Sequence, residues 1–334
     1  MPASDGTRRD FLDVLAAMTV AALGSNGLYA ADERSGDMIY RKLGKTNERV
    51  SAIGLGGYHI GVPATEDESV RLVRAAVDRG ITFLDNCWDY MNGKCEVWMG
   101  KALRDGYRHK VFLMTKFDSR TGAGTARQIE ESLQRLETDR IDLLQFHENI
   151  RLEDPDRFFH DGVAEALLDA RKAGKIRYIG FTGHKDPVVH LRMLEEAQAR
   201  HFAFDSAQMP LNILDAQFRS FAYQVVPKLV EQGIAVLGMK PLANGAIPQN
   251  QIATPAECLH YALTLPTSVV IHGIPDEKAL DQAFDAVRTF HPLTPGELAA
   301  LLSRTRQAAL TGKYEQFKTS SQYDGTAHSP QWMA

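Results

Sequence analysis

The sequence predicts a single (β/α)8 TIM barrel, with an N-terminal β-hairpin at the barrel bottom and an extra helix at the C-terminal end. From Met38 onward, short apolar runs alternate with longer stretches of helical period, and this pair occurs eight times. The units follow one another at a spacing of roughly 30 residues, which is typical of parallel strands joined by helical crossovers. An open doubly wound sheet rarely needs eight such units, whereas a closed barrel does.

Residues 1–31 are expected to be a twin-arginine export signal. Thr7-Arg8-Arg9-Asp10-Phe11-Leu12 precedes a weakly apolar run, Val14 to Leu23, and small residues follow around Leu28-Tyr29-Ala30-Ala31. The run is too short to span a bilayer. An amphipathic helix packed on the body is the alternative. If the signal is used, the twin-arginine machinery exports the folded protein to the periplasm, and the mature chain starts near residue 31 or 32.

The barrel itself is expected over residues 38–312. A hairpin formed by Ile39 to Leu43 and Arg49 to Ser51, with Gly44-Lys45-Thr46-Asn47 between them, would close its bottom. Pro295 to Ala309 is expected to form the extra helix after the last unit. Residues 313–334 are a polar tail, without periodicity from Thr319 onward. Because no low-complexity linker interrupts the body, we expect one domain.

Each predicted strand is a short apolar run of the kind found inside a sheet, and each predicted helix has apolar residues at i, i+3, i+4 and i+7. The strands are Ala52 to Leu55, Thr82 to Leu84, Val111 to Thr115, Ile141 to Phe146, Ile176 to Phe181, Phe204 to Ala207, Ile234 to Gly238 and Ser268 to His272. The helices are Ser69 to Arg79, Cys95 to Arg104, Thr125 to Leu136, Asp161 to Ala173, Val188 to Ala199, Phe218 to Gln232, Pro255 to Leu263 and Glu277 to Val287.

Composition and charge exclude several classes of function. The chain has 334 residues, is 44% hydrophobic and 24% charged, and has a formal charge of -4, all ordinary for a globular protein. It has no Lys/Arg run long enough to follow a phosphate backbone, so no nucleic-acid partner is expected. Cys87, Cys95 and Cys258 are too few and too scattered for a disulfide framework or a zinc knuckle, and we interpret them as packed thiols.

Candidate catalytic residues follow the predicted strands. The active site of such a barrel lies at the carboxyl ends of its strands. Asp85 follows the second strand, Tyr90 comes five residues later, Lys116 ends the third strand and His147 ends the fourth. Each position alone resembles any solvent-facing loop, but together the four would converge at one mouth of the barrel.

The chain resembles the aldo-keto reductases. The matching segments are Phe83-Leu84-Asp85 with Tyr90, Gly93 with Glu96 and Gly100 to Leu103, Thr115-Lys116, Asp142 to His147, and Gly174 to Gly180. The resemblance covers most of residues 38–287, with the motifs in the family's order. It implies an oxidoreductase that interconverts a carbonyl and an alcohol by hydride transfer. Tyr90 would be the general acid/base, Lys116 and Asp85 would tune it, and His147 would orient the carbonyl of a small-molecule substrate.

Carbonyl reduction gives this residue set a physical reason. Hydride addition builds negative charge on the carbonyl oxygen, so a proton donor must lie within hydrogen-bond reach of it. A free phenol, with a pKa of about 10, is too weak an acid near neutrality. We therefore expect the Lys116 ammonium, held charged by Asp85, to favour the Tyr90 phenolate. A nicotinamide cofactor would carry the hydride.

The resemblance also implies a set of cofactor contacts. Gly54-Leu55-Gly56-Gly57-Tyr58 lacks the third glycine of a Rossmann fingerprint, so the dinucleotide is expected across the barrel mouth. The expected contacts are Gly57, Tyr58, Asp85, Thr182, Gly183, Gln208, Met239, Lys240, Pro241, Leu242, Gly273, Lys278 and Gln282. NADP(H) is usual in the family. Only Lys278 and Gln282 remain to contact a 2′-phosphate, however, so NAD(H) stays open.

The expected substrate pocket combines aromatic rings with hydrogen-bonding groups. Its residues are His59, Trp88, Phe117, Glu148 and His184. Rings stack on C–H faces while histidines and acids bond hydroxyls, so this combination suits a sugar or another polyol aldehyde. Packing of Trp88 and Phe117 inside loops is the alternative. The sequence names no particular sugar.

Three other functions stay open at this point. A metal-dependent hydrolase could use His147, Glu148, Asp85 and His184, but the HxH pattern that often opens such a site is absent after the first strand, and no metal is expected. A Schiff-base aldolase could use Lys116 or Lys240. Finally, an exported chain could hold its nicotinamide tightly, acting as a transhydrogenating oxidoreductase or as a regulatory binding module.

Overall fold

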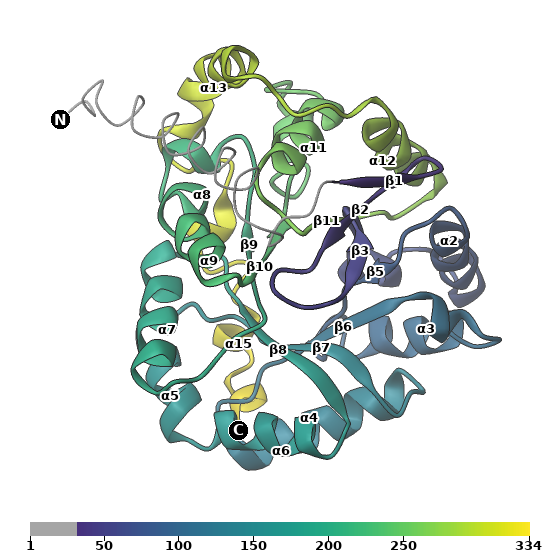
Figure 1. Ribbon diagram of the computed structural model, residues 1–334, viewed down its shortest axis with the longest axis vertical. Helices are drawn as coiled ribbons and strands as arrows, with labels where there is room; N and C mark the ends of the chain where they lie inside the picture. The colour runs from purple at the N-terminus through teal and green to yellow at the C-terminus, as the bar shows by residue number, and fades with distance from the viewer. Residues whose placement is uncertain (1–31) are drawn as a thin grey trace.

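The computed structural model describes residues 32–334, and the predicted export signal lies outside the described residues. Eight parallel strands close into a barrel, in the spatial order β10-β11-β4-β5-β6-β7-β8-β9. Figure 1 shows these strands at the centre of the molecule with the helices around them. The strands are β4 (Ile53–Leu55), β5 (Phe83–Leu84), β6 (Phe112–Phe117), β7 (Ile141–Phe146), β8 (Ile176–Thr182), β9 (Ser206–Pro210), β10 (Ala235–Met239) and β11 (Val269–His272). The predicted fold class is confirmed.

Apolar side chains fill both the barrel interior and the layer between strands and helices. Inside the barrel, Phe83 stacks on Phe112 with ring centroids 5.4 Å apart, and Leu143 and Leu237 complete the packing. The outer layer buries the apolar faces of the surrounding helices against the strands. Side chains of these strands therefore form a packed core below the mouth, and the polar residues at the strand ends lie directly above this core.

The helices between the strands begin with recognisable caps. Thr65 and Glu68 form a capping box at the start of α2, in which the side chain of each residue accepts a hydrogen bond from the backbone N–H of the other. The helices are α2 (Glu66–Asp78), α3 (Lys94–Ala102), α4 (Gly122–Arg135), α5 (Asp154–His160), α6 (Val163–Lys172), α7 (Pro187–Ala199), α8 (Phe221–Gln224), α9 (Val226–Gln232), α10 (Ala246–Gln249), α11 (Pro255–Thr264) and α12 (Glu277–Thr289). None of the helices within residues 32–334 is both long and apolar enough to cross a membrane.

One predicted helix is divided in the structure. The segment expected as a single helix from Phe218 to Gln232 starts only after Ser220, whose side chain caps it, and breaks between α8 and α9. Pro227 lies in the first turn of α9. Proline has no backbone N–H to donate, so it suits a helix start and interrupts a continuing helix.

The two ends of the barrel are covered by different segments. At the bottom, β2 (Met38–Lys42) and β3 (Arg49–Ser51) form the predicted hairpin, to which β1 (Glu33–Ser35) adds a third strand. The amide of Lys45 donates 2.8 Å to the carbonyl of Gly233, just before β10 begins. This sheet therefore contacts the amino ends of the barrel strands.

The tail covers the opposite end. After α13 (Pro295–Ala309), the short helices α14 (Gln316–Thr319) and α15 (Gly325–His328) and the turn η4 (Pro330–Met333) run over the carboxyl ends of the strands. The amide of Arg120, three residues after β6, donates 2.8 Å to the carbonyl of Met333. Figure 1 shows this yellow segment with α15 near the barrel centre. The chain's own C-terminus thus covers the mouth where catalytic residues were expected.

Candidate active site

The predicted catalytic residues come together at the barrel mouth. Asp85 directly follows β5, Lys116 lies in β6 and His147 directly follows β7, so neighbouring strands carry them to one place. The side chain of Lys116, which is only 1% exposed, forms an ion pair with Asp85. Its Nζ atom also donates to the carbonyl of Asn86 at 2.7 Å and lies 3.3 Å from the hydroxyl of Tyr90. The ammonium is therefore fixed in front of the phenol.

A tight loop after β5 places Tyr90. The amide of Trp88 donates 3.0 Å to the carbonyl of Lys116, which ties the loop to β6. Just beyond Tyr90 the chain reverses through Met91, Asn92 and Gly93, with φ angles of 50°, 57° and 84°. Asparagine and glycine accept this left-handed conformation readily, whereas methionine seldom does. The turn therefore holds Tyr90 at the mouth by an unusual backbone path.

The acidity of Tyr90 differs from the sequence-based expectation. Burial raises the pKa of Tyr90 well above its usual value, and the negative charge of Asp85 raises it further. We expected Lys116 to lower this pKa, but Asp85 neutralises much of the lysine's charge and the phenol is shielded from water. At neutral pH Tyr90 thus carries its proton, the state that a general acid needs.

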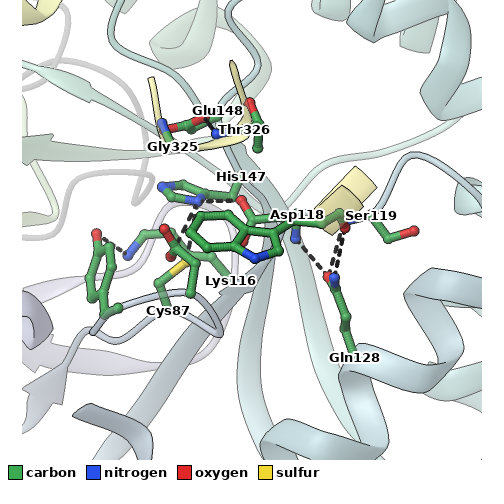
Figure 2. Close-up of polar contacts among 12 residues, drawn as sticks. Cys87, Lys116, Asp118, Ser119, Gln128, His147, Glu148, Gly325 and Thr326 are labelled. Carbon is green, nitrogen blue, oxygen red and sulfur yellow. Dashed lines mark hydrogen bonds and ion pairs between the residues drawn. The ribbon is translucent and has the colours of Figure 1, made fainter. Parts of the chain in front are cut away.

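His147 lies in an acidic pocket. Its Nδ1 atom is 2.8 Å from Oδ1 of Asp118 and 3.2 Å from Sγ of Cys87. Figure 2 shows His147 next to these two side chains. Burial lowers the pKa of His147, although nearby carboxylates such as Asp89 oppose this. The rings of His147 and Tyr90 lie edge to face with centroids 6.0 Å apart. His147 and Tyr90 can therefore face one carbonyl oxygen.

Sequence reasoning missed three members of this pocket. Cys87 was interpreted as a packed thiol, and neither Asp89 nor Asp118 was assigned to the site. In the structure, Asp118 is fully buried and the side chain of Asp89 is only 13% exposed. The one available signal was position, because Asp118 directly follows a barrel strand, like His147.

Gln208 and Lys240 are suited to hold a dinucleotide. The Nε2 atom of Gln208 donates 3.2 Å to Asp85, while its Oε1 atom is buried without a hydrogen-bond partner. Burial and the charge of Lys116 lower the pKa of Lys240 to about 8. Within residues 32–334, Lys240 has no carboxylate partner and instead lies near the rings of Phe317 and Tyr323. A buried amide oxygen and an unpaired cation fit a nicotinamide carboxamide and a phosphate, respectively.

The other expected cofactor residues lie around the same mouth. Gly57 packs so closely that a Cβ atom would lie 2.3 Å from the carbonyl oxygen of Asp85, and one on Gly183 would lie 2.3 Å from that of Asn149. Tyr58 is 51% exposed. Thr182 ends β8, Met239 ends β10 and is followed by Pro241 and Leu242, Gly273 follows β11, and Lys278 and Gln282 are exposed on α12.

The expected substrate residues divide into three groups. His59 packs near Gly273, and the indole of Trp88 donates 2.6 Å to Glu131 and contacts Trp332 of the tail edge to face. Phe117, by contrast, is fully buried against Phe146. It therefore packs in the core, the alternative considered for it.

Glu148 and His184 bind the tail. Glu148 accepts hydrogen bonds from the amides of Gly325 and Thr326 and from the Thr326 hydroxyl at 2.6, 2.7 and 2.6 Å (Figure 2). Nε2 of His184 lies 3.0 Å from Oδ1 of Asp324. Both side chains are thus engaged by the chain's own C-terminus.

The ligand set considered for a metal-dependent hydrolase does not form. Asp85 is bound to Lys116, and Glu148 and His184 are bound to the tail, so these three do not join His147. Within the described residues, a different group with metal-binding atoms lies around His147, formed with Cys87, Asp89 and Asp118.

Comparison with known proteins shows the family of the chain. Residues 52–301 match the family described as "Aldo/keto reductase family". The chain is 30% identical to the uncharacterized oxidoreductase YrpG of Bacillus subtilis over 230 residues, covering 63% of this chain and 68% of that protein. It is 28% identical to the L-galactose dehydrogenase of Arabidopsis thaliana over 229 residues, covering 63% and 67%.

A solved structure shares the fold. The holo form of the aldo-keto reductase AKR11C1 from Bacillus halodurans superposes with a TM-score of 0.68 at 23% identity, covering 83% of this chain and 99% of that one.

Proposed function

Because the chain belongs to the aldo/keto reductase family and is therefore an oxidoreductase of carbonyls and alcohols, we propose that Tyr90 is its general acid/base. The observation that carries the proposal is the contact of 3.3 Å between Nζ of Lys116 and the Tyr90 hydroxyl, with Asp85 paired to the same lysine. A phenol held next to a fixed ammonium can release a proton to a substrate oxygen and retain a stabilised phenolate.

The proton transfer follows from the charges at the mouth. A nicotinamide dinucleotide, when bound, supplies the hydride. As negative charge develops on the carbonyl oxygen, the Tyr90 O–H bond breaks and its proton passes to that oxygen. Lys116 then stabilises the phenolate left behind. Burial lowers the pKa of His147, and when the proton of the neutral ring lies on Nε2, this nitrogen donates a second hydrogen bond that orients the carbonyl.

We propose NADP(H) as the cofactor, with NAD(H) as the alternative. The unpartnered Oε1 of Gln208 would accept from the carboxamide, and Lys240, without a carboxylate partner among the described residues, would bind a phosphate. Lys278 and Gln282 are exposed near the start of α12 and would contact a 2′-phosphate. Replacing Lys278 or Gln282 would then weaken NADPH binding more than NADH binding.

We propose a sugar or another polyol aldehyde as the substrate. The L-galactose dehydrogenase relative acts on a sugar by its name, and Trp88 provides an indole next to the mouth. Turnover of a panel of aldoses and small carbonyls, measured with NADPH and with NADH, tests this. Reduction of polyol aldehydes above simple aldehydes supports the proposal. Failure to turn over any carbonyl with either nucleotide would refute it.

A second candidate keeps the same chemistry but retains the cofactor. The tail is bound to Glu148 and lies near Lys240, so it would hinder exchange of a dinucleotide. If the predicted twin-arginine signal delivers the folded chain to the periplasm, a retained nicotinamide would cycle between an oxidised and a reduced substrate. This candidate requires nicotinamide fluorescence in protein purified without added cofactor, and freely exchanging cofactor would exclude it.

A further inference from the structure

Four side chains beside the catalytic residues bring metal-binding atoms together. Cys87, Asp89, Asp118 and His147 each offer one such atom, and these atoms lie within 4.8 Å of one another. Two come from the loop after β5, and the others directly follow β6 and β7. This group differs from the proposed catalytic residues, and His147 is the one residue that belongs to both.

The distances in this cluster suit a tetrahedral ion. Nδ1 of His147 lies 2.8 Å from Oδ1 of Asp118, 3.2 Å from Sγ of Cys87 and 3.8 Å from Oδ1 of Asp89. Zinc binds nitrogen and oxygen at about 2.0–2.2 Å and sulfur at about 2.3 Å, so neighbouring ligand atoms in a tetrahedron stand about 3.3–3.6 Å apart. Small shifts would bring the four atoms to that geometry.

The cluster also contains buried oxygens without partners. Oδ1 of Asp89 and Oδ2 of Asp118 are shielded from solvent and accept no hydrogen bond, and Asp118 is fully buried. Among the described residues, neither carboxylate forms an ion pair with a lysine or an arginine; the ion-pair partner of both is His147. Unpaired polar atoms of this kind are costly.

The negative charge of the two carboxylates also favours a bound cation. Asp118 is fully buried and the Asp89 side chain mostly so, and both carboxylates lie beside the same imidazole without a lysine or an arginine paired to them among the described residues. A bound cation would compensate these buried negative charges and keep both carboxylates ionised.

We propose that Cys87, Asp89, Asp118 and His147 together hold one divalent transition-metal ion, with zinc preferred. A thiolate and an imidazole favour borderline-soft ions such as zinc over magnesium or calcium, which prefer oxygen ligands. Four protein ligands complete a tetrahedral shell, and such closed sites are structural rather than catalytic. The ion therefore positions residues and does not activate the substrate.

The site would act on His147. A metal on Nδ1 leaves the ring proton on Nε2, the nitrogen for which the described residues provide no hydrogen-bond partner. This tautomer is the one that can donate to a substrate oxygen. The side chains of His147 and Asp89 keep 11% and 13% of their surface exposed, so an ion can reach the cluster from the mouth.

Metal binding by the full-length protein tests the proposal directly. The purified chain is stripped with a chelator, reloaded with zinc, desalted and analysed for zinc by mass spectrometry. We expect about one zinc per wild-type chain and at least tenfold less retained zinc per chain in Cys87→Ser and in Asp118→Asn. Cys258→Ser, which removes a buried thiol in α11, should retain zinc like the wild type.

Cobalt gives a second readout that needs no variant. Cobalt bound to wild-type protein should show a thiolate-to-metal charge-transfer absorption and tetrahedral d–d bands. Wild-type protein that retains no zinc beyond the Cys87→Ser level, or that binds cobalt without the thiolate band, would overturn the proposal. Because these readouts measure bound metal and not turnover, their failure is separate from failure of the proposed carbonyl reduction.

Discussion

The Nζ atom of Lys116 lies 3.3 Å from the hydroxyl of Tyr90 while its charge is paired with Asp85. Lys116→Met keeps the length of the side chain and removes the charge that stabilises the phenolate. We expect kcat for carbonyl reduction to fall about a hundredfold to a thousandfold, as when one oxyanion-stabilising donor is removed elsewhere.

The matched control is Lys175→Met, which removes an exposed lysine that pairs with Glu130. It should leave kcat within twofold of the wild type, by the small effect expected of surface pairs. Equal rates in Lys116→Met and the control would contradict a role for the ammonium.

Arg120 organises the strand ends at the mouth. Its guanidinium pairs with Asp154, both side chains being fully buried, and donates 2.8 Å to the carbonyls of His147 and Glu148. Arg120→Met removes the buried cation next to Asp154 and leaves this carboxylate with the longer pair to Arg151, at 3.7 Å, so we expect a loss of about 3–5 kcal/mol in the free energy of unfolding. Urea denaturation followed by circular dichroism measures this.

Arg79→Met breaks an exposed pair with Asp281 and serves as the comparison. Its expected cost is below about 1 kcal/mol. If Arg120→Met and Arg79→Met lowered the free energy of unfolding by the same small amount, the buried network around Arg120 would not stabilise the mouth as described.

Lys240 gives cofactor binding a pH dependence of defined sign. Burial and Lys116 lower the pKa of Lys240 to about 8, so its ammonium is present below that pH and lost above it. If it binds a dinucleotide phosphate, NADPH affinity should fall as the pH rises through about 8, by at most about tenfold per pH unit. A bound anion favours the charged lysine, so the pKa of Lys240 is higher in the complex. The affinity therefore stops falling only above that higher pKa.

Fluorescence titrations with NADPH at several pH values between 6.5 and 9.5, approximate limits set around that pKa, check this. In Lys240→Met the affinity should be weaker and flat across the range. A wild-type affinity that stays constant, or a slope that survives in Lys240→Met, would assign the phosphate to other residues.

Glu148 holds the tail across the mouth. It accepts three hydrogen bonds from Gly325 and Thr326. Glu148→Gln replaces one acceptor oxygen with an amide donor, which faces donors of the tail. We therefore expect faster hydrogen exchange and proteolysis in residues 319–334 and faster exchange of bound NADPH. Glu130→Gln, at an exposed pair with Lys175, should change neither. Unchanged tail protection in Glu148→Gln would show that other contacts suffice.

The barrel could be predicted because its signals are local. Phe83 and Leu84 form a short apolar run, and α2 shows its capping box within four consecutive residues. Because the carboxyl ends of parallel strands share one mouth, the approach of Asp85, Lys116 and His147 followed from their positions after the strands.

The position of the tail could not be predicted in this way. Glu148 and Thr326 are 178 residues apart, and neither segment has a sequence pattern that predicts their contact. The same holds for the cluster at His147, since Cys87 looked like an ordinary packed thiol. The pKa of Tyr90 also escaped prediction, because it depends on burial by segments distant in the sequence.

The most direct test of the account is Tyr90→Phe, which removes only the phenolic oxygen. We expect kcat/KM for carbonyl reduction to fall about a hundredfold to ten-thousandfold, the usual contribution of a general acid. NADPH binding, measured by fluorescence on the same preparation, should stay within about threefold of the wild type, because no proton is transferred in that step. Lost turnover with retained cofactor binding is the predicted result; turnover equal to that of the wild type would contradict the assignment of Tyr90 as the proton donor.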